Sequence, residues 1–285
     1  MKITEQFPPL PLEVLVDRIK NFETASMDDK HKLISDLVNI HPFLSADFSK
    51  GHVFRRARKI LPDEYPSKVQ DLLWNPNLSR IGRVNPEGYS VLYVSDRIET
   101  TFSEIHVKDD YVLLSEIEIQ EGEKCRIYPI GELIKVQRTG RGFLIGDNSS
   151  AVNDMLNACD RESSQSLLIT DAFLLDCLIK DDDKYLISSY TAKCIFEKNT
   201  NISAIAYPSV QQFGALNFAV KTDYFWKNWC VVAARRMKVK DLPLGFYKWS
   251  KTEHVNDIDP DGNLNWEKED FDDLYSHRFT PWYQR

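Results

Sequence analysis

GRVNPEGYSVLYVSDRIETTFSEI, residues 82–105, is the stretch of this chain that decides its fold. Its opening predicts a turn at 85–88, because Pro fixes φ and Gly tolerates positive φ. The apolar run VLYV at 91–94 then predicts a buried strand. A helix should follow, since Asp96 and Glu99 have the spacing of a capping box. Its buried face is expected to carry three residues spaced i, i+4 and i+7, namely Ile98, Phe102 and Ile105.

Three chemically versatile side chains belong to this short segment: Arg83 on the turn, Tyr93 on the strand and Glu104 on the helix. Taken singly, each fits an ordinary structural role. A tyrosine on an apolar strand is usually part of the core, and Glu104 lies off the apolar stripe, where solvent is expected. An arginine beside a Pro-Gly turn is usually just exposed. The other motifs along the chain are needed to decide whether these residues have a structural or a functional role.

A second arginine motif precedes this segment. HVFRRARKI at 52–60 predicts a strand, and alternation places Phe54, Arg56 and Arg58 on one face. Two arginines on one face of a strand indicate either the lining of a cleft or an exposed edge. The residues of the strand alone leave both interpretations open.

Taken together, these motifs resemble the RES-domain family. The resemblance rests on the aromatic-x-Arg-Ala-Arg strand at 54–58, the GRxNP-x-G turn, the LYxS strand and the T-x-x-S-E helix. Tyr-Pro-Ser at 207–209, followed by Gly214 and Asn217, completes it, and the similar region runs from about residue 52 to about 235. It implies an α+β fold like that of ADP-ribosyltransferases: a mixed, mostly antiparallel sheet with surrounding helices and a cleft between the sheet halves. Family members break down NAD⁺ and include the toxins of RES–Xre toxin–antitoxin pairs.

The resemblance also assigns roles for cleaving the bond between nicotinamide and ribose. Nicotinamide leaves this bond as a neutral molecule, so the site needs no general acid, unlike ordinary glycosidases. It needs a hold on the pyrophosphate and a carboxylate near the ribosyl cation. The resemblance implies that one or both of Arg56 and Arg83 hold the phosphates or the nicotinamide ribose, and that Glu104 supplies the carboxylate. Tyr93 is expected to stack on nicotinamide and Ser209 to hydrogen-bond the ligand. The candidates are therefore Glu104, Arg83 and Arg56 for catalysis, and Tyr93, Ser209, Arg58 and Asn85 for substrate binding.

Length and composition limit the other possibilities. The chain has 285 residues, 42% of them hydrophobic and 28% charged, as expected for a globular protein with a large core. A net charge of −7 disfavours nucleic-acid binding, and no apolar run is long enough for a membrane span. The start of the chain lacks the apolar core of a signal peptide. Five scattered cysteines favour a reducing compartment and no metal site, so we expect the cytoplasm.

Three segments are predicted along the chain. Residues 1–50 should form a helical hairpin, with helices beginning near Pro11 and Asp28. Residues 51–235 should form the RES-like NAD-binding domain. Residues 236–285 are expected to be a tail whose acidic part lies in solvent and whose terminal aromatic residues fold back onto the body.

Three functions stay open at this point. The first is an NAD⁺ glycohydrolase or phosphorylase that acts as a growth-inhibiting toxin or defence effector. The second is an ADP-ribosyltransferase that modifies a macromolecule, and the third is a non-catalytic nucleotide-binding protein. No cofactor is expected, because NAD⁺ would be the substrate. Candidate partners are NAD⁺, inorganic phosphate, an Xre-like antitoxin implied by the family and a second copy of the chain; neither a nucleic acid nor a membrane is expected.

Overall fold

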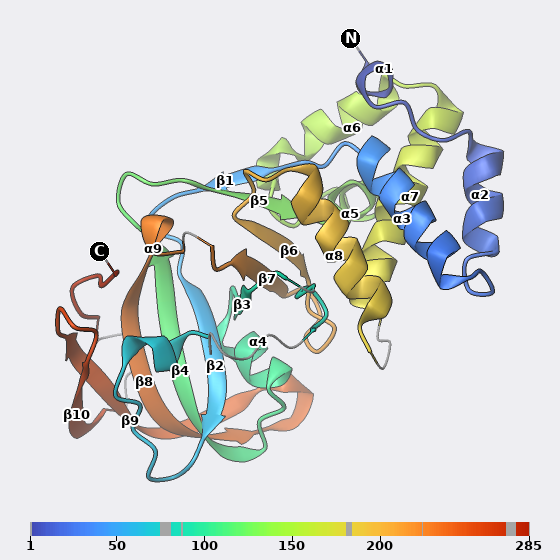
Figure 1. Ribbon diagram of the computed structural model, residues 1–285. Coiled ribbons are helices and arrows are strands. Elements are labelled where there is room, and N and C mark those ends of the chain that lie inside the picture. Colours follow the sequence, from blue (N-terminus) through green and yellow to red (C-terminus); the bar gives the residue numbers. More distant parts are fainter. Residues whose placement is uncertain are drawn as a thin grey trace. The chain divides into compact units, whose positions relative to one another are not determined.

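The computed structural model describes residues 2–74, 81–86, 88–180, 184–223, 225–271 and 278–284. Its internal contacts divide the chain into two compact units, each assembled from three separate segments (Figure 1). Each unit combines segments from different parts of the chain. The three segments predicted from the sequence, 1–50, 51–235 and 236–285, were consecutive. Unit 1 comprises Met1–Ala46, Ser79–Tyr89 and Arg126–Tyr207, and unit 2 comprises Asp47–Leu78, Ser90–Cys125 and Pro208–Arg285.

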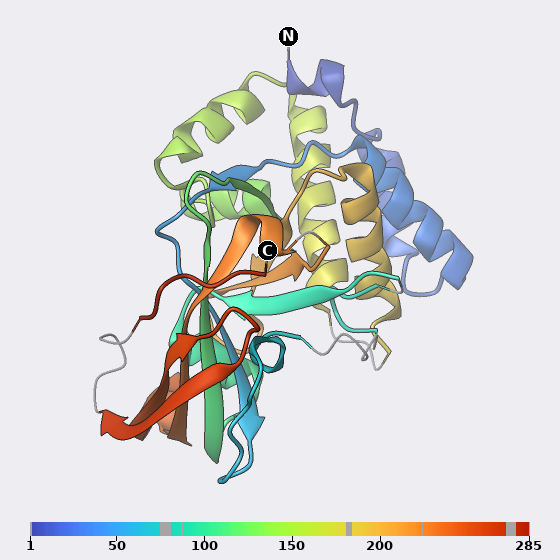
Figure 2. The same ribbon diagram turned by 60° about the vertical axis from the view of Figure 1, so that its left-hand side comes forward.

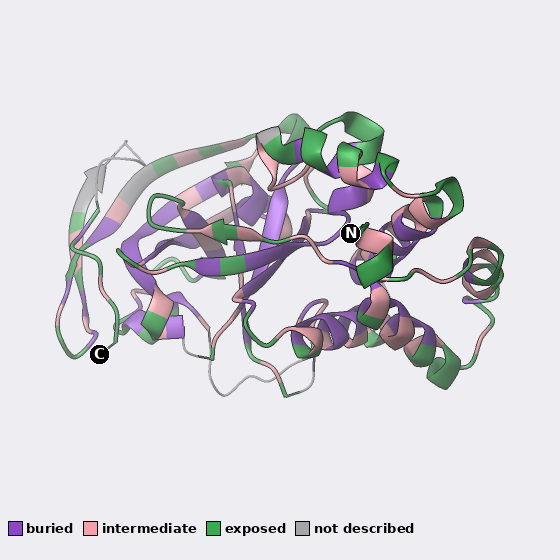
Figure 3. Cartoon of the chain, turned by 90° about the horizontal axis from the view of Figure 1, so that it is seen from above, coloured by how far each residue is buried: buried purple, intermediate pink, exposed green. Residues whose placement is uncertain are grey.

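Unit 1 is mainly helical. The helices predicted near Pro11 and Asp28 are confirmed as α2 and α3, and both pack on α7; α3 also packs on α8. The helices show buried inner faces and exposed outer faces (Figure 3). None of the described helices is long and apolar enough to cross a membrane. The elements are α1 (Ile3–Gln6), α2 (Leu12–Lys20), α3 (Met27–Ile40), β5 (Cys125–Pro129), α5 (Glu132–Thr139), η2 (Gly146–Asn148), α6 (Ser149–Asn157), α7 (Arg161–Ile179), α8 (Leu186–Lys198) and β6 (Ala204–Pro208), with β1 (Ala46–Phe48) at the unit boundary.

Unit 2 is built around antiparallel strands in the order β7-β3-β2-β4-β8-β9-β10. The strand and helix predicted within 82–105 are confirmed as β3 and α4. The elements are β2 (Phe54–Ile60), η1 (Val69–Leu72), β3 (Val91–Ser95), α4 (Ile98–Glu104), β4 (Asp109–Ile119), β7 (Leu216–Lys221), α9 (Phe225–Asn228), β8 (Trp229–Asp241), η3 (Pro243–Gly245), β9 (Tyr247–Ile258) and β10 (Leu264–Phe271). Because β5 and β6 pair in parallel within unit 1, the prediction of an α+β fold with mixed, mostly antiparallel strands is confirmed.

The segment predicted as an acidic tail is largely part of the sheet, which corrects the expectation that it lies in solvent. Strands β9 and β10 pair next to β8 and are seen at the red end of the chain in Figure 2. Val255, Ile258 and Leu264 are buried there. Asp257 and Asp261, by contrast, are exposed, so the apolar residues of this segment pack within the unit while these carboxylates reach solvent.

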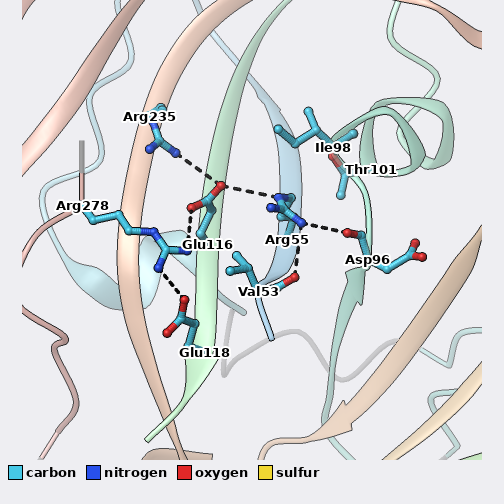
Figure 4. Close-up of polar contacts among 9 residues, drawn as sticks. All are labelled: Val53, Arg55, Asp96, Ile98, Thr101, Glu116, Glu118, Arg235 and Arg278. Carbon is cyan, nitrogen blue, oxygen red and sulfur yellow. Dashed lines mark hydrogen bonds and ion pairs between the residues drawn. The ribbon is translucent and has the colours of Figure 1, made fainter. Parts of the chain in front are cut away.

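The last described residues do fold back, as predicted. Trp282 exchanges two backbone hydrogen bonds with Val231 of β8, at 2.9 and 3.0 Å. Its indole nitrogen donates to the carbonyl of Asp259 at 2.9 Å. Arg278 forms an ion pair with Glu118 at 2.6 Å (Figure 4). Backbone contacts therefore fasten these residues to β8, and side-chain contacts fasten them to Asp259 and to Glu118 of β4.

The sheet of unit 2 parts between β2 and β3. These strands pair at a single position, Arg55 with Ser95, whereas β2 pairs with β4 along its full length, from Phe54 to Ile60. Helix α4 contacts both strands at this point. Its apolar residues Ile98 and Phe102 join a core made with β2, β4 and β8. A split strand pair bridged by one short helix is the structural frame on which the predicted residues lie.

Candidate active site

Glu104 lies at the end of α4 and is held through one of its two carboxylate oxygens. The Ser209 hydroxyl and the Asn217 side-chain amide both donate to Oε1, each at 2.6 Å. Short donor contacts of this kind are typical of charge-assisted hydrogen bonds to a carboxylate. Among the described residues, no hydrogen bond is recorded at Oε2. Protein donors therefore hold one oxygen of the carboxylate, and among the described residues none holds the other.

Asn217 is itself held by a buried hydroxyl group, that of Ser95. The Ser95 hydroxyl donates to Oδ1 of Asn217 at 2.6 Å, and these two residues are only 3% and 6% exposed. They are direct partners in the pairing of β3 with β7, so their side chains leave the sheet on the same face. The result is a continuous chain of hydrogen bonds from Ser95 through Asn217 to Glu104.

Ser209 uses its whole hydrogen-bonding capacity within the protein. A serine hydroxyl offers one donor and two acceptor positions. The proton of Ser209 goes to Glu104, and its oxygen accepts from the backbone N–H groups of Gln211 and Gln212 at 3.1 and 3.0 Å. Gln212 is in turn tied to α4, since the Thr100 hydroxyl donates to its side-chain oxygen at 2.6 Å. Ser209 thus connects its own loop to the helix that carries Glu104.

Arg56 and Tyr93 meet where the sheet parts. A guanidinium nitrogen of Arg56 donates to the Tyr93 carbonyl at 3.3 Å. Alternation from the Arg55–Ser95 pair puts the Arg56 side chain on the opposite face from Ser95, and Tyr93 on the same face as Ser95. Burial, reinforced by repulsion from Arg58, lowers the pKa of Arg56 to about 10. The guanidinium still carries its charge at neutral pH.

The other arginines of β2 have protein partners. Arg58 forms an ion pair with Glu64 at 2.8 Å. Arg55 donates to the Asp96 carbonyl at 2.8 Å and lies 3.5 Å from the Glu116 carboxylate (Figure 4). In Arg56 and Arg58 the Nε–H group is buried with no acceptor recorded among the described residues. The same is true of Arg55 and Arg236, so this feature does not distinguish Arg56 and Arg58 from the other buried arginines.

Arg83 and Asn85 lie in unit 1. Gly82 and Asn85 exchange two backbone hydrogen bonds of 3.1 Å, which close a turn at 82–85. The turn predicted at 85–88 includes Glu87, which lies outside the described residues. The Arg83 guanidinium donates to the carbonyl of Ile179, at the end of α7, and lies 5.8 Å from the Tyr185 ring centroid. A cation at a helix C-terminus is favoured by the helix dipole. The convergence of this arginine with the residues of unit 2 stays a prediction.

The structure brings together Glu104 and Ser209. Arg56 contacts the backbone carbonyl of Tyr93, but alternation places the Arg56 and Tyr93 side chains on opposite faces of the sheet. Sequence reasoning did not assign Ser95 and Asn217 to the site. Both residues appeared only as part of the family resemblance, Ser95 as the last residue of the LYxS strand and Asn217 after the Tyr-Pro-Ser motif. The signal that joins them is the register of β3 against β7, which depends on a pairing of residues 122 positions apart. No local pattern encodes such a register.

Comparison with known proteins places the chain in a family. The family model described as RES domain matches residues 54–228, which is more than half of the chain and includes every predicted site residue. No curated protein and no solved structure matches the chain. The likeness of its fold to ADP-ribosyltransferases therefore stays an expectation from the resemblance. The matched segment contains the β3–α4 unit, the arginines of β2 and the Ser209 loop, and the chain belongs to the RES-domain family.

Proposed function

We propose that this protein degrades NAD⁺ by cleaving the N-glycosidic bond between nicotinamide and ribose. Membership of the RES family supports an NAD-related, toxin-like role in general terms. The observation that carries the specific reaction is the Glu104 carboxylate, pinned at Oε1 by two donors and with no partner recorded at Oε2. A fixed carboxylate of this kind is what the reaction demands.

Cleavage of this bond requires electrostatic stabilisation of the positive charge that develops on the ribose. The bond between C1′ and the pyridinium nitrogen breaks, and its electron pair leaves with neutral nicotinamide. A ribosyl oxocarbenium ion remains, and a preorganised negative charge beside it lowers the barrier. Water then adds its oxygen to C1′ and loses a proton, which gives ADP-ribose. If phosphate is the acceptor, a phosphate oxygen adds to C1′ instead.

Five of the candidate residues have a task in this scheme. Glu104 accepts hydrogen bonds from the ribose hydroxyls through Oε2 and stabilises the cation at C1′. Arg56 and Arg58 present the guanidinium groups that can hold the pyrophosphate. Tyr93 supplies an aromatic face for nicotinamide. Ser209 holds the carboxylate, since its donor and acceptor positions are occupied by protein.

The experiment is to incubate the purified protein with NAD⁺, with and without inorganic phosphate, and to identify the sugar product by mass spectrometry. Release of ADP-ribose regardless of phosphate identifies a hydrolase, and a phosphorylated sugar formed only with phosphate identifies a phosphorylase. Transfer of label from NAD⁺ to a macromolecule in lysate, with little free product, would instead establish an ADP-ribosyltransferase. Binding of NAD⁺ without any turnover would refute the enzymatic proposal.

The toxin role needs a cellular test. Induced expression is expected to lower the cellular NAD⁺ pool and to stop growth, and both effects should disappear in a Glu104→Gln variant expressed at the same level. A growth defect that persists in this variant would show that the toxicity arises elsewhere in the protein. The Xre-like antitoxin remains part of the same proposal, to be tested by co-expression with a candidate partner.

A further inference from the structure

We propose that Ser95 and Asn217 form a positioning device that fixes the orientation of the Glu104 carboxylate, an inference that rests on the proposed function. Neither residue would touch the substrate. Ser95 holds the Asn217 side chain through its amide oxygen, and Asn217 holds the carboxylate through its amide NH₂ group. The device is built on paired positions of β3 and β7, which makes it as rigid as the sheet.

Asn217 can hold the Glu104 carboxylate in only one of the two orientations of its side-chain amide. An asparagine side chain carries a carbonyl oxygen that only accepts and an NH₂ group that only donates. Glu104 requires a donor, so the NH₂ must face it. The Ser95 hydroxyl can donate to Oδ1 at 2.6 Å only when the amide has this orientation. If the amide were flipped, Oδ1 would lie against the carboxylate and the two oxygens would repel each other.

Burial makes the arrangement costly to lose. Ser95 and Asn217 are 3% and 6% exposed, so water cannot readily replace a missing hydrogen bond. Ser209 also donates to Oε1. With only that donor left, the carboxylate could rotate about its terminal torsion, which is broad in glutamate. Asn217 supplies the second point of attachment that prevents this rotation.

The sharpest test is Asn217→Asp, which keeps the shape of the side chain and replaces the donor with a second carboxylate. Two carboxylates at hydrogen-bond distance share a proton, and the pair gives it up only at higher pH. We therefore expect the acid limb of the kcat profile for NAD⁺ cleavage to move to higher pH by about one unit or more. The matched control is Asn228→Asp, because Asn228 donates its amide to Glu123 at 3.0 Å in the same unit. This control should leave the profile unchanged.

Ser95 provides an independent test if the aspartate variant does not fold. Ser95→Ala should lower kcat about 10-fold with little change in KM, because one buried hydrogen bond is lost while the ligand contacts remain. Ser95→Thr keeps the hydroxyl and should restore most of the rate. Ser166→Ala serves as the control, since Ser166 is fully buried and donates at 2.6 Å to a carbonyl of unit 1. It removes a similar bond and should leave kcat unchanged.

These outcomes separate the inference from the function on which it rests. If the wild-type protein does not consume NAD⁺, the proposed function fails. If the wild-type protein is active but Asn217→Asp leaves the acid limb in place, the positioning role is refuted. An equal loss of kcat in Ser95→Ala and Ser95→Thr would refute it as well, because the hydroxyl would then be irrelevant.

Discussion

The buried carboxylate of Glu116 offers the most specific prediction about stability. It lies 3.5 Å from Arg235, 3.5 Å from Arg55 and 3.8 Å from Arg278 (Figure 4). Glu116 and Arg235 are 3% and 1% exposed. Burial lowers the pKa of Arg235, and attraction to Glu116 opposes that shift. The Glu116 carboxylate therefore compensates the positive charge of Arg235, whose burial would otherwise be strongly unfavourable.

The perturbation is Glu116→Gln, which keeps the size of the side chain and removes its charge. Removing one partner of a buried ion pair costs about 3–5 kcal/mol, because the other charge stays buried and uncompensated. We expect the lower end, about 3 kcal/mol, since the contacts of 3.5 Å are looser than an ideal charge-assisted hydrogen bond. With a urea m-value of about 3 kcal/mol/M, the unfolding midpoint should fall by roughly 1 M.

The assay is urea denaturation followed by tryptophan fluorescence and by circular dichroism. The matched control is Glu121→Gln, because the Glu121 side chain is 84% exposed and pairs with Lys50 at the surface. Its midpoint should not change measurably. A midpoint for Glu116→Gln no lower than that of Glu121→Gln would refute the reasoning. A partial recovery in the double variant with Arg235→Met is also expected, because no charge is then left unpaired at that position.

Two further predictions concern substrate binding and backbone strain. Arg56→Lys keeps the charge but loses the bidentate fork, so KM for NAD⁺ should rise about 10-fold or more with a smaller change in kcat; an unchanged KM would remove Arg56 from the binding site. Gly131→Ala should destabilise the protein by roughly 1–3 kcal/mol more than Gly140→Ala. Both glycines have positive φ, +82° and +72°, but a Cβ at Gly131 would come within 2.5 Å of Leu175, whereas Gly140 faces open space. Equal thermal shifts in the two variants would contradict this account.

The sequence predicted best where one local pattern determines the structure. The apolar run at 91–94 predicted β3, and the helical spacing of Ile98, Phe102 and Ile105 predicted α4. The proposed capping box did not form: α4 begins after Arg97, with no side-chain cap. The carboxylate of Asp96 accepts instead from the backbone of Leu216 at 3.2 Å. A tertiary partner on β7 thus replaced the local one.

The site itself was only partly predictable. Glu104 lies off the apolar stripe of its helix, and periodicity alone places it in solvent. In the folded protein it is half-buried, because Ser209 and Asn217 approach it from segments more than 100 residues away. The same limit applies to β9, whose charged residues suggested a solvated tail. The burial of Glu104 and the position of β9 both depend on strand pairing between distant segments. No short stretch of the sequence contains that information.

The most direct test of the central claim compares nicotinamide release from NAD⁺ by the wild-type protein and by Glu104→Gln. The amide oxygen of glutamine can still accept from Ser209 and Asn217, so the surroundings of the side chain should be preserved while its charge is lost. We predict that the wild-type protein releases nicotinamide and that the variant, equally folded and still able to bind NAD⁺, is slower by about 100-fold or more. Equal rates for the two proteins would contradict the account.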